Sequence, residues 1–300
     1  MQRNHPIFHR ISQLIGFLLG ARFFVTLLLT FALYVSTFFL FSREEGFRQF
    51  VFDFKVHGII FCAVLSILCG GMINQFYDRD KDKLTKPFTS KLQNFIKQKY
   101  FLYAYLLLCA VSLIIAWFIS LHVFIFFVAY QFLMWFYSHK LSKILFLNNL
   151  TFVALSLYPF FGMLIYYQRF SLRILVMAIF LFLILLAIDI LKDMLTKNAD
   201  KVFGYQTLAN RFGNKISRNI TVFLLSALSV VGIILSIHQG FHLVMSWYFL
   251  LTSFMVALCV FLLFSNRKNT RFYTLNILRL WVFIGILAML ADGITSKFAL

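Results

Sequence analysis

Charged side chains are scarce in this 300-residue chain, at 13% of its composition, and only 10 residues are Asp or Glu. Hydrophobic residues make up 62%, including 41 Phe. A bundle of this size cannot hide so much apolar surface from water, so a soluble globular domain is excluded. The sequence therefore predicts an integral membrane protein.

Cysteine is also rare, and its four copies, Cys62, Cys69, Cys109 and Cys259, all fall within apolar stretches. Thiols in such places are small packing side chains, so neither a disulfide framework nor a zinc site is indicated. The first apolar run is too long for a signal peptide and has no small-residue cleavage pattern after it, which excludes a cleavable signal. No run alternates with the period of two that marks an outer-membrane barrel strand.

Long apolar runs are what the sequence has in abundance. They predict nine transmembrane helices in a single domain over residues 1–300, at about 14–41, 57–77, 100–119, 121–137, 145–167, 172–191, 218–237, 241–264 and 274–296. Residues 1–12 are expected to form an interfacial lead-in, and 78–99 and 192–217 to form cap loops. Little beyond Ser120 separates the third and fourth runs, which predicts a tight hairpin there.

The formal charge of +18 would suit nucleic acid, but its distribution indicates a membrane instead. Lys and Arg gather in alternate loops, at 78–99, 138–143, 192–218 and 265–273, and they are few or balanced by acids in the loops between. By the positive-inside rule the N-terminus is cytoplasmic and the C-terminus lies outside, as in a protein of the bacterial inner membrane. The chemistry below would then face the cytoplasm.

The first acidic cluster follows the second apolar run. Asn74, Asp78 and Asp82 are spaced i, i+4 and i+8, so on a continuing helix they share one face over about 12 Å. Stacked carboxylates at the edge of an apolar bundle are costly unless a cation lies between them. Oxygen ligands with no His or Cys nearby favour a hard cation such as Mg²⁺.

The second acidic cluster closes the sixth run. Asp189 and Asp193 are one turn apart, and Asp200 returns to nearly the same face if the helix persists. Counting Asp80, which lies between Asp78 and Asp82, six of the ten acids lie in these two clusters. Acids at the C-terminal end of a helix oppose its dipole, so simple anchoring does not explain them.

Weaker signals lie elsewhere. Phe88, Leu92, Phe95 and Ile96 share one face of a predicted amphipathic helix, and the segment 207–218 repeats that pattern. Tyr137, Lys140 and Lys143 suit an interfacial loop. Asp292 is expected to meet a polar partner or the outer interface, and Arg279 to act as an anchor.

Two separated aspartate motifs at matched helices make the chain resemble the UbiA superfamily of intramembrane prenyltransferases. The resemblance rests on Asn74-xxx-Asp78-xxx-Asp82 after the second span, Asp189-xxx-Asp193 with Asp200, Gly204 and Thr207 after the sixth, and Tyr137-Ser138-His139-Lys140-Leu141 with Asn149 beyond it. It covers most of residues 57–213, and helix count and topology agree over the whole chain.

That resemblance implies a bundle around a lipid-accessible cavity and a polyprenyl diphosphate donor whose head lies at the cytoplasmic mouth. Two Mg²⁺ would bridge the diphosphate, held by Asn74, Asp78, Asp82, Asp189 and Asp193, with Asp200 a further candidate ligand. Lys140, Lys143 and Lys192 would contact its oxygens, and Tyr137 and Asn149 would line the substrate site. Aromatic quinone precursors are the commonest acceptors in the superfamily. Glycerol-phosphate lipids and a phosphorylated pentose are alternatives.

The chain departs from the superfamily pattern in three places. Gln75 stands where an Asp is usual, Thr196 where an Asp is often found, and Lys86-Pro87 where an Arg-Pro pair is common. Asp80 and Asp200 are possible compensating acids. The competing functions are a divalent-cation carrier or isoprenoid-binding protein, and a CDP-alcohol phosphotransferase, whose Asp-Gly and Ala-Arg pairs do not occur around Asp78.

Overall fold

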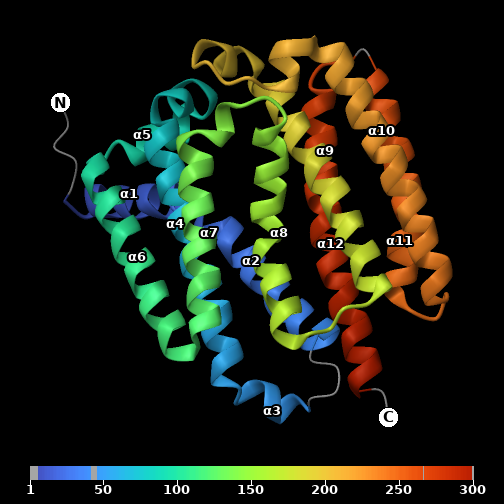
Figure 1. Cartoon of the computed structure of the whole chain (residues 1–300). Helices are drawn as coiled ribbons and strands as arrows, with labels where there is room; N and C mark the ends of the chain where they lie inside the picture. Colours follow the sequence, from blue (N-terminus) through green and yellow to red (C-terminus); the bar gives the residue numbers. More distant parts are fainter. Residues whose placement is uncertain (1–5, 42–45, 266, 299–300) are drawn as a thin grey trace. The chain divides into compact units, whose positions relative to one another are not determined.

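The computed structural model describes residues 6–41, 46–265 and 267–298. Every regular element in these ranges is helical, and nine of their helices are long and apolar enough to cross a membrane (Figure 1). The prediction of an all-α, multi-pass membrane protein is therefore confirmed. The chain divides into two compact units, unit 1 with residues 1–34 and 44–142, and unit 2 with residues 35–43 and 143–300.

Unit 1 is built on α4, the helix that carries the first acidic cluster. Its helices are α1 (Pro6–Gly20), α2 (Phe23–Ser36, whose last residues fall in unit 2), α3 (Phe47–Val51), α4 (Phe54–Thr85), α5 (Pro87–Gln93), α6 (Gln98–Ile119) and α7 (Leu121–His139). α6 and α7 form the expected hairpin, in which the Ser120 hydroxyl accepts from the Val123 amide at 3.2 Å. Both pack along α4, and Gln131 donates to Ser66 at 3.1 Å.

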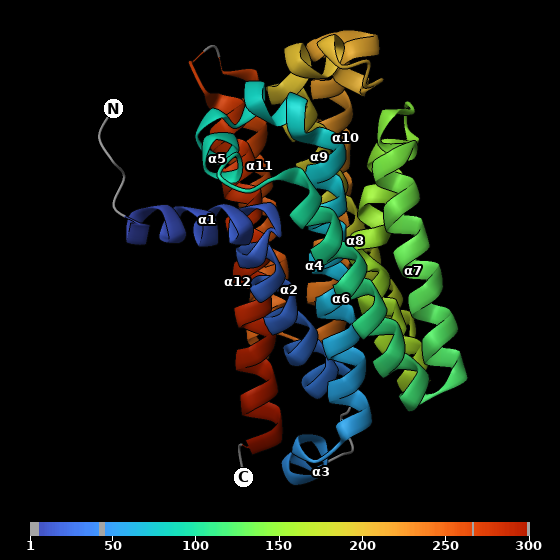
Figure 2. The same cartoon turned by 90° about the vertical axis from the view of Figure 1, so that its left-hand side faces the viewer.

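The prediction of one long first helix is wrong. α1 ends at Gly20, Arg22 has a positive φ of 54°, and α2 then runs in a new direction, nearly across α1 (Figure 2). The bend buries Ala21 against Met72 and Phe101. Gly71 permits the approach, since a Cβ there would lie 2.7 Å from the Ala21 carbonyl oxygen. The described part of the lead-in is thus a helix that reaches Gly20 instead of stopping near residue 12.

The predicted cap loops begin as helix, because α4 continues to Thr85 and α9 (Leu172–Val202) extends well past the apolar run. The predicted amphipathic helix after α4 is also wrong in extent, since α5 ends at Gln93, before Phe95. Its buried face is polar, with Ser90 and Gln93 covered while Phe88 is 75% exposed. The segment is held by packing along α1 and by the hydrogen bond from Gln75 of α4 to Gln93.

Unit 2 contains the π-helical turn η1 (Thr37–Phe41), α8 (Leu147–Tyr167), α9, α10 (Leu208–Gln239), α11 (Val244–Phe264) and α12 (Thr270–Phe298). The short turn η2 (Leu141–Lys143) leads into it. η1 packs on both α8 and α12, with the rings of Phe41 and Phe160 5.1 Å apart. α10 and α11 form an antiparallel pair in which Ser229 donates to Ser253 at 2.9 Å.

Two local features shape unit 2. Gly213 has φ 81° and ψ 170° inside α10, so the chain changes direction there and the predicted continuous amphipathic helix over 207–218 is wrong. At the other end of the unit, the Asp292 carboxylate accepts from the backbone amides of Val244 and Met245 at 2.6 and 2.9 Å. Asp292 on α12 therefore caps the start of α11, so of the two expectations, a polar partner or the outer interface, it meets the first.

Candidate active site

The acids of unit 1 lie on a continuous helix, as their spacing predicts. Asn74, Asp78 and Asp82 all fall within α4 and are all half-buried. The Asn74 amide donates to Asp78 Oδ2 at 2.9 Å, and Lys86 Nζ lies 3.1 Å from Asp82 Oδ1. One face of α4 therefore presents an amide and two carboxylates in register.

Neighbouring polar residues of α4 are engaged elsewhere. Gln75 is buried and donates to Gln93 of α5 at 3.4 Å. Asp80 is exposed and pairs with Lys83 at 2.6 Å. Arg79 donates to Gln98 at 3.0 Å and to Asn94 at 3.1 Å. Gln75 therefore joins two helices where many relatives are expected to carry a further acid.

The end of α7 is connected to the same part of α4. The His139 ring stacks on Trp135 at 5.4 Å and meets the Tyr77 ring edge-on at 5.6 Å. Tyr137 is half-buried, and Lys140 is exposed just beyond the helix. His139 thus positions the end of α7, which carries Tyr137 and leads into Lys140, two of the predicted substrate contacts.

The acids of unit 2 are held together by an amide from another helix. Asn149 Nδ2, near the start of α8, donates to Asp189 Oδ2 at 2.8 Å and to Asp193 Oδ2 at 2.9 Å. Asn148 Nδ2 also donates to Asp193, at 3.2 Å. All four of these side chains are buried. Burial strengthens each of these charge-assisted hydrogen bonds, so the carboxylates are tightly positioned.

Asn148 is a partner of the acid pair that the sequence did not predict. Its side-chain Oδ1 accepts from the backbone N–H of Asn149 at 2.7 Å, which fixes the side chain that reaches Asp193. The signal available in the sequence was a pair of adjacent amides at the start of an apolar helix. Nothing in that pair shows which carboxylate it meets 45 residues later.

Of the three lysines predicted to contact the diphosphate, Lys192 forms an ion pair with Asp189, one of the predicted metal ligands. Its ammonium lies 3.0 Å from Asp189 Oδ1 and 5.0 Å from the centre of the Phe152 ring. Lys143 instead lies 5.6 Å from the ring centre of Tyr205, and its carbonyl oxygen accepts from the Gln206 amide at 3.2 Å. Lys143 therefore contacts the turn between α9 and α10.

Asp200 lies further along α9 and is fully buried. Thr196 donates to its Oδ2 at 2.7 Å, so the residue that replaces an expected Asp serves as a hydrogen-bond donor to the next acid. No group of three His, Cys, Asp or Glu side chains within the described ranges converges on one point. Thr196 therefore orients the Asp200 carboxylate from one turn earlier on the same helix.

The residues of unit 2 fit a hard cation. Asn149 Oδ1 is buried and has no hydrogen-bond partner among the described residues, although it lies on the side chain that joins two carboxylates. Amide and carboxylate oxygens are the ligands that Mg²⁺ accepts, and Mg²⁺ typically takes only one or two carboxylates, completing its shell with water and phosphate oxygens. Two carboxylates and one amide therefore suffice for such a site.

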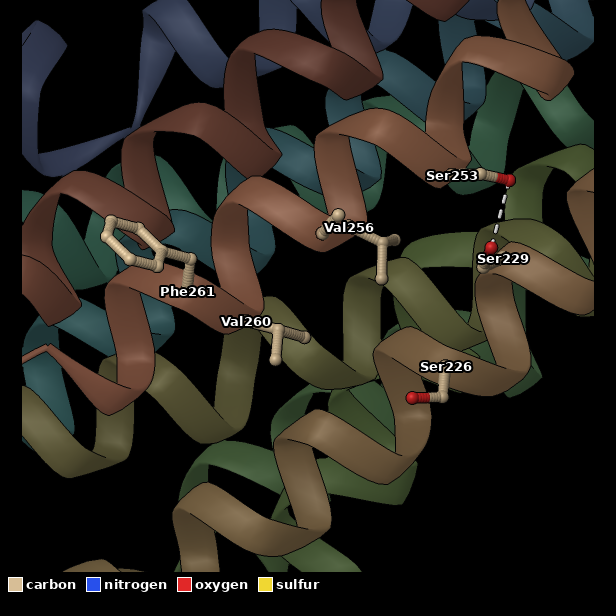
Figure 3. Close-up of a pocket in the computed structure, with 7 residues that line it drawn as sticks. Ser226, Ser229, Ser253, Val256, Val260 and Phe261 are labelled. Carbon is tan, nitrogen blue, oxygen red and sulfur yellow. Dashed lines mark hydrogen bonds between the residues drawn. The ribbon is translucent and has the colours of Figure 1, made fainter.

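A pocket of about 540 Å³ lies elsewhere in unit 2, between α10 and α11 (Figure 3). Its lining is Ser226, Ser229, Ser253, Val256, Ala257, Val260 and Phe261. No titratable side chain lines it, so it does not supply the chemistry sought here.

Comparison with known proteins identifies the family of the chain. Residues 47–287 match the UbiA prenyltransferase family. A digeranylgeranylglyceryl phosphate synthase of Pyrococcus furiosus is 26% identical over 246 residues, covering 81% of this chain and 87% of that protein. A protein of the same name from Thermococcus kodakarensis is 24% identical over 240 residues, covering 79% and 86%.

Solved structures share the fold. One described as a digeranylgeranylglyceryl phosphate synthase in membranes is similar with a TM-score of 0.68 at 18% identity, covering 94% of this chain and 99% of the other. A UbiA homologue from Archaeoglobus fulgidus bound to GPP and Mg²⁺ has a TM-score of 0.63 at 15% identity, covering 92% and 99%. With the family match spanning most of its length, this multi-pass membrane protein belongs to the UbiA prenyltransferase family.

Proposed function

We propose that this prenyltransferase uses Mg²⁺ to transfer a polyprenyl group from its diphosphate to a membrane-associated acceptor that carries a glycerol phosphate. The observation that carries the proposal is the Asn149 amide that joins Asp189 and Asp193, together with the Asn74, Asp78 and Asp82 face of α4. The curated relatives are named for a glyceryl phosphate product, which favours this acceptor over the aromatic one first expected.

In this proposal, both acid sets act on the donor. Bound Mg²⁺, two ions in our proposal, would neutralise the charge that develops on the departing diphosphate. Asn148 and Asn149 hold the carboxylates of unit 2 in place, and Lys192 adds a positive charge beside Asp189. Tyr137, Lys140, Lys143 and Asp200 are further candidates for substrate or metal contacts.

The chain's apolar helices would hold the isoprenoid tail and keep water from the allylic cation left when the C–O bond breaks. Aromatic rings such as Phe152 can stabilise such a cation by about 0.5–2 kcal/mol each. The excess of Lys and Arg in the loops on the acid side supports a cytoplasmic orientation for the reaction.

The test uses purified protein in vesicles with labelled polyprenyl diphosphate, supplied with a polyprenylglyceryl phosphate or with an aromatic acceptor, and identifies products by mass. We expect Mg²⁺-dependent diphosphate release and a product with the glyceryl phosphate. Asp78→Asn and Asp189→Asn should each abolish it, while Asp80→Asn, whose carboxylate pairs with Lys83, should not. Undiminished product from either of the first two variants would refute the assigned roles.

A cation carrier is the competing function. It predicts Mg²⁺ flux into sealed vesicles that depends on Asp78 and Asp189 but needs no isoprenoid. We expect no such flux, because the acids gather at the ends of α4 and α9 and do not form a series across the spans.

A further inference from the structure

The first half of α12 carries two polar side chains inside a candidate membrane span, Asn276 and Arg279. They are one helical turn apart and both are exposed. Arg279 lies nine residues after Thr270, the first residue of the helix, or about 13 Å along its axis. Within residues 6–41, 46–265 and 267–298, neither side chain makes a hydrogen bond or ion pair.

The sequence before and within α12 supplies no free acid, and no ion pair to Arg279 occurs among the described residues. Residues 201–291 contain no Asp or Glu at all, and Asp292 is engaged at the start of α11. Ionisable residues within spans are costly and normally have a partner or a function. Arg267, Lys268 and Arg271 already lie at the beginning of α12 and before it, where interfacial anchors belong. Arg279 lies about 12 Å deeper than Arg271, by the rise of an α-helix, so it needs another explanation.

Packing within unit 2 shows which side of α12 carries Arg279. The face toward α11 bears Trp281, whose indole donates to Thr252 at 3.0 Å, and Gly285, which lies against Tyr248. Gly293 lies against Phe39 of η1. Arg279 and Gly293 are separated by nearly four whole turns and so project from similar sides of the helix.

The same side leads toward the acid set of unit 2. η1 packs on both α12 and α8, and α8 is the helix whose Asn149 holds Asp189 and Asp193. An anion bound by Arg279 would therefore lie on the η1 and α8 side of α12, away from α11.

We propose that Arg279 and Asn276 bind the phosphate of the acceptor. A guanidinium donates two parallel hydrogen bonds to a phosphate, and an amide NH₂ one turn away can donate a third. This inference rests on the proposed function, in which the donor diphosphate is already held by acids and Mg²⁺ while the acceptor phosphate has no assigned partner. Arg279 would thus determine specificity for a phosphorylated acceptor.

The experiment compares two acceptors that differ only in the phosphate, a polyprenylglyceryl phosphate and the matching polyprenylglycerol. For Arg279→Leu, we expect KM for the phosphorylated acceptor to rise about 10-fold to 100-fold, the usual effect of losing hydrogen bonds to a charged group. KM for the phosphate-free acceptor and for the donor should stay unchanged. For Arg279→Lys, the KM for the phosphorylated acceptor should lie between the values of the wild type and of Arg279→Leu. Arg271→Leu on the same helix is the matched control.

Other results would overturn the inference. An equal rise in KM for both acceptors, or no rise, would make Arg279 a membrane anchor, and a rise confined to the donor would assign it to the diphosphate. If Arg279→Leu does not fold, Arg279→Lys provides the same comparison. Should the wild-type protein transfer prenyl groups only to phosphate-free acceptors, the acceptor in the proposed function fails instead, which separates the two failures.

Discussion

At the residue scale, the side-chain amide of one residue, Asn149, orients two carboxylates. Asn149 lies 40 residues before Asp189 in the chain, yet its Nδ2 bonds both carboxylates of the pair. Sequence spacing predicts the acids, since i, i+4 positions share a helix face. It cannot predict the amide, because that contact depends on how α8 packs against α9.

Asn149→Ala should raise the Mg²⁺ concentration that the reaction needs for half-maximal activity. Without the shared donor, the two buried carboxylates repel each other and lose their fixed orientation. Loss of a group that positions metal ligands typically costs about 10-fold to 100-fold in metal affinity or activity. A titration of prenyl transfer against Mg²⁺ concentration measures the shift. Ser156→Ala, further along α8, should leave the midpoint unchanged, and an unchanged midpoint in Asn149→Ala would contradict the assigned role.

Gln75→Asp, which restores the acid usual in the superfamily, should destabilise the protein without adding activity. The Gln75 side chain is buried, and its Nε2 donates to Gln93 of α5. An Asp carboxylate has no N–H to donate to Gln93, and it would remain shielded from water. An unsatisfied buried polar group costs about 1–3 kcal/mol, and more when charged. Thermal unfolding in detergent should report the loss, with the exposed Asp80→Asn as the control. Higher activity at unchanged stability would contradict this reading.

At the element scale, hydropathy predicts the nine spans but not their ends. α4 and α9 continue past their apolar runs because acidic and basic side chains in their last turns can face polar surroundings while the backbone hydrogen bonds persist. The bend between α1 and α2 has no local signal of comparable strength. It depends on Ala21 meeting Met72 and Phe101, residues distant in the chain.

Gly213→Ala should destabilise the start of α10. Its φ of 81° suits glycine, and no neighbouring atom would touch an added Cβ, so the effect is conformational alone. The expected cost is about 1 kcal/mol or more. Gly46→Ala is a matched control, because Gly46 also has open space around it but has a φ of −68°. Protease sensitivity near residue 213 and thermal stability should change only in Gly213→Ala. Equal effects in both variants would refute the conformational explanation.

Asp292→Ala should lower stability by about 0.5–2 kcal/mol, the usual value of a helix cap. Two backbone amides of α11 lose their acceptor, while the acids of α9 are untouched. We expect a lower thermal midpoint with unchanged KM values below that temperature. His242→Ala, in the same turn, should be near neutral. A large change in KM for either substrate would show that Asp292 does more than cap a helix.

At the scale of the whole molecule, the charge distribution predicts the orientation in the membrane. Loops with excess Lys and Arg are expected on the cytoplasmic side, which places the ends of α4 and α9 there. Cysteine substitutions in the wild-type background, whose own thiols lie within spans, allow a direct measurement.

In intact cells of a bacterial host, Phe241→Cys should react with a membrane-impermeant maleimide, and Val202→Cys only after permeabilisation. Both residues are exposed, and α10 separates them by one crossing. Labelling in the reverse order would invert the topology and place the acids outside. Labelling of both in intact cells would show that α10 does not span the bilayer.

The contact between Asp292 and the first turn of α11 implies an order of assembly during synthesis. α11 leaves the ribosome before α12. Until Asp292 has been synthesised, the backbone amides of Val244 and Met245 therefore lack this hydrogen-bond acceptor. α12, which is made later, therefore completes the start of α11. A nascent chain released before residue 292 would present an uncapped hairpin to the quality-control proteases of the membrane.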